Sequence, residues 1–73
     1  MEMDAKAIGR CLRSLRGEKT REEVSMALNI GQSTLAMYEQ GERIPRDPIK
    51  IRIANYYKKP IADIFFADAQ HET

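Results

Sequence analysis

The spacing of the apolar residues is the feature that most restricts what this chain can fold into. Apolar residues recur at intervals of three and four, which is the period of an α-helix, and they do not alternate with polar residues as in a half-buried strand. Ile8, Cys11, Leu12 and Leu15 form the first such stripe and predict a helix over about residues 4–16. The spacing therefore predicts an all-α fold without a sheet.

Capping residues mark the start of a second and a third helix. Thr20 and Glu23 have the S/T-x-x-E spacing of a capping box, in which each side chain accepts a hydrogen bond from the backbone N–H of the other residue. This box predicts a helix over about 20–28. Gly31 is an acceptable N-cap for the next helix, over about 32–40.

Glycine and proline indicate the remaining helix ends. Gly17 is predicted to end the first helix in the left-handed conformation. Asp47 is predicted to cap a fourth helix with Pro48 in its first position, where proline is preferred. Pro60 ends that helix, and a short fifth helix follows. The sequence thus predicts five short helices.

Length and charge indicate one domain with two basic segments. The 73 residues suffice for a single domain, predicted to consist of a helical part over 4–66 and a flexible tail over 67–73. The net charge is only +1, but residues 1–21 carry +3 and residues 42–59 carry +4. If the fold brings these two segments to one face, they form a footprint for a polyanion.

Several classes of protein are excluded by what the sequence lacks. Cys11 is the one cysteine, so we expect no internal disulfide and a reducing, cytoplasmic location. No apolar run approaches the roughly 18 residues of a membrane span, and the acidic N-terminus is unlike a signal peptide. His71 has no ligand cluster nearby, so no metal or cofactor is expected. Without a catalytic constellation or a phosphate loop, we expect neither an enzyme nor a small-molecule substrate.

Residues 20–41 carry the strongest functional signal. Two short predicted helices are joined by a turn, with the small side chains of Ser25 and Asn29 where the helices must approach closely. Leu35 and Tyr38 would fill the angle between them. This pattern is typical of a helix-turn-helix, in which two helices cross at about 90–120° and the second is free to enter a DNA major groove.

The ordered motifs resemble the phage repressor/Cro-type (XRE) helix-turn-helix family over roughly residues 7–66. The matching motifs are Leu12-Arg13-x-Leu15-Arg16, Thr20-Arg21-Glu22-Glu23-Val24, Ile30-Gly31-Gln32-Ser33-Thr34-Leu35-x-x-Tyr38-Glu39-x-Gly41-x-Arg43-x-Pro45, Asp47-Pro48-Ile49-Lys50-Ile51-x-Ile53-Ala54-Asn55-Tyr56-Tyr57 and Ile61-x-Asp63-Ile64-Phe65-Phe66. The resemblance implies a compact, lambda-repressor-like bundle of five helices from a bacterium or phage. It also implies sequence-specific binding of double-stranded DNA and transcriptional regulation, commonly repression.

The resemblance further implies base contacts from the third helix, the recognition helix. Gln32, Ser33 and Met37 take the positions that face the bases. Glutamine suits adenine, serine is promiscuous, and methionine offers apolar contact to a thymine methyl group. This set favours an A·T-leaning half-site.

By the same resemblance, a second group of residues contacts DNA phosphates and so positions the recognition helix without specifying sequence. These residues are Thr20, Arg21, Gln40, Arg43 and Arg46. The two basic segments coincide with this group, which is independent support. Lys50 and Arg52, by contrast, are expected on ordinary solvated faces.

The family pattern also assigns one structural pair and two departures. Arg16 and Glu39 stand where the family often pairs an arginine with a glutamate, which braces the first helix against the third. Arg21 stands where the family usually has glutamine, so the contact there should shift toward plain charge. Lys58 replaces a common glycine, which predicts a strained or differently shaped end of the fourth helix.

Two questions about partners stay open at the level of sequence. A homodimer is expected, with its interface at Lys59 and Phe66. The adjacent Tyr56 and Tyr57 either contribute to this dimer seam or are partly buried. The alternative function is a protein-interaction module of the same fold, such as an antitoxin or an accessory regulator that binds a protein partner.

Overall fold

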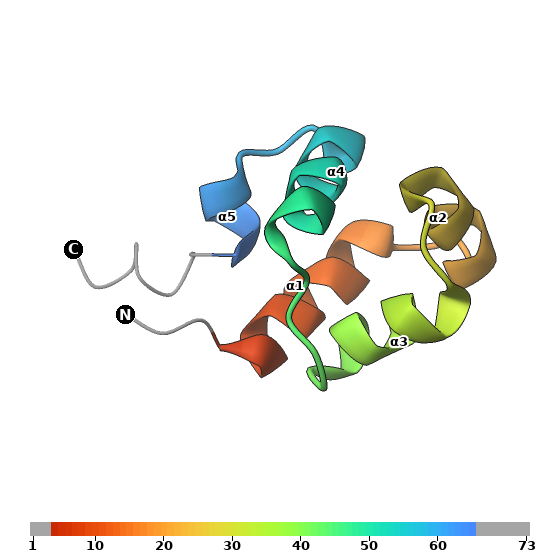
Figure 1. Ribbon diagram of the computed structural model, residues 1–73, viewed down its shortest axis with the longest axis horizontal. Helices are drawn as coiled ribbons and strands as arrows, with labels where there is room; N and C mark the ends of the chain where they lie inside the picture. Colours follow the sequence, from red (N-terminus) through yellow and green to blue (C-terminus); the bar gives the residue numbers. More distant parts are fainter. Residues whose placement is uncertain (1–3, 66–73) are drawn as a thin grey trace.

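The computed structural model describes residues 4–65, which form five α-helices (Figure 1). In chain order they are α1 (Ala5–Arg16), α2 (Arg21–Leu28), α3 (Gln32–Gln40), α4 (Asp47–Tyr57) and α5 (Ile61–Phe65). This part of the chain contains no strand, which confirms the all-α prediction. None of its helices is long and apolar enough to cross a membrane. The predicted tail over 67–73 lies outside the described residues.

Side-chain caps fix the starts of the first two helices. The Asp4 carboxylate accepts hydrogen bonds from the N–H groups of Lys6 and Ala7 at 3.0 and 3.3 Å. At α2, the Thr20 Oγ accepts from the Glu23 N–H at 3.0 Å. The Glu23 carboxylate makes no return bond to the Thr20 N–H, so only half of the predicted capping box forms.

Two helix boundaries differ from the prediction, and a third agrees with it. The Arg46 carbonyl accepts from the Lys50 N–H at 2.9 Å, so the first turn of α4 closes one residue early and Asp47 is the first helical residue instead of the cap. Gly17 has the expected positive φ of 57° but a ψ of −124°, outside the left-handed helical region. Lys58 adopts the left-handed conformation that glycine commonly supplies here, with φ 58° and ψ 47°, so the end of α4 is strained as expected.

Buried apolar residues from all five helices form the core. Their positions are Ile8, Leu12, Val24, Leu28, Leu35, Tyr38, Ile53, Ala54, Ile64 and Phe65. α1 runs through the middle of the molecule and packs on α3 and α5, while α2 packs on α3 and α4 (Figure 1). Gly9 permits a close approach of α1 to α3, because a Cβ atom there would lie 2.4 Å from the Glu39 carbonyl oxygen.

Two basic residues of α4 make specific contacts, and Lys50 departs from the expectation of an ordinary solvated face. Lys50 is only 7% exposed, pairs with Asp47 at 3.5 Å and lies over the Phe65 ring. Arg52 reaches α2, where its Nη1 donates to the Leu28 carbonyl at 2.8 Å. The stem of a long basic side chain can cover apolar surface while its charged end finds a partner, as at buried Lys50. Arg52 stays exposed, as expected.

The tyrosine pair of α4 is partly buried. The rings of Tyr56 and Tyr57 pack edge to face with their centroids 4.9 Å apart, and both contact the core. Burial raises the pKa of Tyr57 to about 12. Of the residues predicted at a dimer interface, Lys59 is exposed and Phe66 lies outside the described residues.

Candidate nucleic-acid interface

A tight turn sets α3 against α2. Asn29 ends α2 in the left-handed conformation, with φ 59° and ψ 46°, which asparagine tolerates well. The Ile30 N–H then donates to the Ser25 carbonyl at 3.0 Å, which closes the turn. Ser25 is 2% exposed and its Oγ donates to the Glu22 carbonyl at 3.1 Å, so its hydroxyl is satisfied inside the helix pair. The small serine lets the two helices meet.

The outer face of α3 carries the three residues predicted to contact bases. Gln32 and Ser33 are exposed in its first turn, and Met37 is partly exposed one turn later. Leu35, Tyr38 and Glu39 face inward and are buried. The partly exposed Ala36 also lies on the outer side, because it follows Ser33 by three residues and Gln32 by four. Ala36 was not among the residues predicted to contact bases, because a single methyl group is common on buried and exposed helix faces alike.

An arginine from α1 holds α3 through a buried carboxylate. Arg16 Nε donates to Glu39 Oε2 at 2.7 Å, and Arg16 Nη2 donates to Glu39 Oε1 at 3.1 Å. The Glu39 side chain is 0% exposed and that of Arg16 is 17% exposed. The hydrogen bond to Glu39 raises the pKa of Arg16 above its ordinary value. A fork-to-fork pair of this kind fixes orientation as well as charge.

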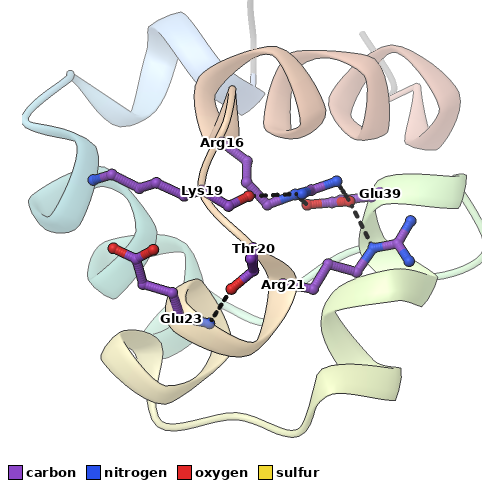
Figure 2. A network of polar contacts seen from close by, with 6 residues as sticks. All are labelled: Arg16, Lys19, Thr20, Arg21, Glu23 and Glu39. Carbon is purple, nitrogen blue, oxygen red and sulfur yellow. Dashed lines mark hydrogen bonds and ion pairs between the residues drawn. The ribbon is translucent and has the colours of Figure 1, made fainter.

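Two further hydrogen bonds connect this ion pair to the α1–α2 connection and to α2 (Figure 2). Arg16 Nη1 donates to the Lys19 carbonyl at 2.9 Å, which ties down the short connection between α1 and α2. Arg21, at the start of α2, donates from Nε to Glu39 Oε1 at 3.2 Å, and its side chain is 39% exposed. We call Arg16, Arg21 and Glu39 the arginine–glutamate cluster. No pattern in the sequence pointed to Arg21 as a member.

The residues predicted to contact phosphates are accessible. Thr20, Gln40, Arg43 and Arg46 are exposed, and Arg21 is partly exposed. The Thr20 Oγ accepts from the Glu23 N–H, which leaves its own O–H free to donate. Within residues 4–65, Arg43 and Arg46 make no ion pair. The described residues also contain no cluster of three or more metal-ligating side chains.

Comparison with known proteins identifies the arrangement of α2 and α3. The helix-turn-helix family matches residues 12–64. The crystal structure of the clp gene regulator ClgR from C. glutamicum matches with a TM-score of 0.73 and 23% sequence identity, over 88% of this chain and 86% of that chain. At that identity the likeness shows a common fold. A search of the curated proteins finds no match. Because the family covers most of its length, this chain belongs to the XRE-type helix-turn-helix family of DNA-binding transcriptional regulators and is not an enzyme.

Proposed function

We propose that this protein is a repressor that reads the major groove of double-stranded DNA with α3, binding as a homodimer to two half-sites. The observation that carries the proposal is the division of α3 into two faces. Its inner face is buried and is held by the ion pair between Glu39 and Arg16 of α1. Gln32 and Ser33 are exposed at its start. In helix-turn-helix proteins the first residues of the second helix are those that reach base edges.

The charge distribution supports the same proposal. Arg43 and Arg46 follow α3 in the chain, and Thr20 and Arg21 begin α2, so accessible donors flank the recognition helix on both sides in sequence. In this proposal they bind phosphates and set the register, while Gln32, the first residue of α3, forms a bidentate contact to adenine. Two half-sites about 34 Å apart would suit a two-fold dimer.

The first experiment selects bound duplexes from a random pool and measures their affinity by fluorescence anisotropy at several salt concentrations. We expect a two-fold symmetric site, and each neutralised phosphate should contribute about −0.9 to the slope of log K against log salt. Gln32→Ala should reduce discrimination at one base pair by about 1–3 kcal/mol. Exposed Ser14, on α1, provides the control as Ser14→Ala, which should change neither quantity.

Two results would contradict the proposal. Affinity that is independent of salt would mean that no phosphates are neutralised. Selection without any enriched sequence would mean that α3 reads no bases. Either result would favour the protein-interaction alternative, in which the exposed face of α3 serves no purpose in recognition.

A further inference from the structure

The arginine–glutamate cluster holds one more cation than its carboxylate requires. Arg16 already meets both oxygens of Glu39 in a two-pronged pair, and the Glu39 side chain is fully buried. A buried carboxylate needs a partner, and Arg16 alone supplies it. Arg21 adds a third bond to Oε1, from a more exposed position. Its contribution is therefore not explained by neutralising Glu39.

The way in which Arg21 binds leaves its most useful donors free. A guanidinium carries five N–H groups, and Arg21 uses the single one on Nε. The terminal nitrogens point away from Glu39 (Figure 2) and have no partner within residues 4–65. Holding Nε restricts the rotation of a long side chain, so less conformational entropy remains to be lost when the terminal fork binds a ligand.

We propose that Glu39 is a positioning residue for Arg21, and that Arg21, held through Nε, grips a DNA phosphodiester with both terminal nitrogens. This inference rests on the proposed function and deepens it at one residue. A planar fork matches two phosphate oxygens, which a point charge does not. It also revises the expectation that arginine at this position supplies plain charge, because the geometry of the guanidinium carries the contact.

The variant Arg21→Lys shows whether Arg21 acts by charge alone or through its tethered guanidinium fork. A lysine has one Nζ, which cannot bond Glu39 and reach a phosphate in the same way, whereas arginine divides these tasks between Nε and the terminal nitrogens. If Arg21 acts by charge alone, Arg21→Lys should bind DNA as the wild type does. If the tethered fork matters, Arg21→Lys should behave like Arg21→Ala. Exposed Arg13, an α1 residue that is assigned no contact with bases or phosphates and has no ion pair in residues 4–65, is the matched control.

The experiment measures affinity for the selected duplex at four salt concentrations, with unfolding monitored by circular dichroism to confirm that each variant is folded. We expect Arg21→Lys and Arg21→Ala each to weaken binding about tenfold or more. Each variant should also make the salt slope less steep, by about 0.9. Arg13→Lys should stay within about threefold of the wild type, because it keeps the charge of a solvated residue that has no assigned contact with the duplex.

Glu39→Gln, alone and combined with Arg21→Ala, tests the positioning role directly. If Glu39 acts through Arg21, the loss of affinity caused by Glu39→Gln should be smaller when Arg21 is already alanine. If Glu39→Gln does not fold, the lysine comparison decides alone. Wild-type affinity and slope in Arg21→Lys would overturn this inference and leave the proposed function intact. A wild-type protein that binds no duplex would refute the proposed function, and this inference with it.

Discussion

Replacing Gly9 by alanine should separate α1 from α3. A Cβ atom at this position would lie 2.4 Å from the Glu39 carbonyl oxygen and 2.8 Å from that of Tyr38. The shorter distance is about 1 Å below an ordinary contact, which begins at 3.4 Å. Both obstacles are backbone atoms inside α3, so no side chain can rotate to make room, and one helix must shift as a body.

Two opposing contributions determine the size of the effect. Alanine in a helix interior is favoured over glycine by about 1 kcal/mol, which would stabilise α1 if it stood alone. Overpacking a core contact costs about 1–3 kcal/mol, and backbone obstacles place Gly9 at the upper end of that range. We therefore expect Gly9→Ala to lower the free energy of unfolding by about 2 kcal/mol. In a domain of this size that corresponds to a fall in Tm of about 8–16 °C.

Urea unfolding followed by circular dichroism measures this quantity. Ser14→Ala is the control, since Ser14 is an exposed residue of the same helix and its replacement should change stability by less than about 0.5 kcal/mol. If Gly9→Ala proved as stable as the wild type, or more stable, the close approach of α1 and α3 would be refuted, because only the gain in helix propensity would remain.

Two further outcomes follow from local conformation and burial. Lys58→Gly should raise the free energy of unfolding by about 0.5–1 kcal/mol, because a non-glycine residue is strained at φ 58°. Asn29→Gly, at φ 59°, should raise it by less, because asparagine tolerates this conformation. If Lys58→Gly were no more stable than the wild type, the assigned end of α4 would be contradicted. Burial raises the pKa of Tyr57 from 10.0 to about 12, so the unfolded state releases this proton first and stability should fall as pH rises from about 10 to about 12. Phenolate absorbance should show a transition near pH 12 that is lost in Tyr57→Phe. If the transition that Tyr57→Phe removes lay near pH 10 instead, the ring would not be buried.

Local signals sufficed to predict the helices. The period of the apolar residues placed all five, and Gly31 and Asn29 mark the turn between α2 and α3 as expected. These features depend on interactions within a few residues, which the order of the sequence makes visible. The start of α4 was misplaced by one residue because the Arg46 carbonyl, and not a side chain, closes its first turn.

Contacts between segments that are distant in the sequence were harder to predict. The pairing of Arg16 with Glu39 was expected only from family resemblance, and its distances come from the structure. The bond from Arg52 to the Leu28 carbonyl was missed, because an arginine among exposed α4 residues looks the same whether or not it reaches another helix. Arg21 was assigned to phosphate, and its bond to Glu39 depends on how α2 and α3 cross, which spacing alone does not specify.

α1 contacts α3 at two points, and under the proposed function this arrangement separates affinity for DNA from base specificity. Gly9 and Arg16 are seven residues apart, two helical turns, so they lie on the same face of α1. Gly9 meets the backbone of α3 at Glu39, and Arg16 meets the side chain of that residue. Gln32, which stands exposed at the other end of α3, has no part in either contact. Displacing α3 through Gly9 should therefore weaken binding to every duplex alike, whereas only changes on the outer face, such as Gln32→Ala, should alter which base pair is preferred.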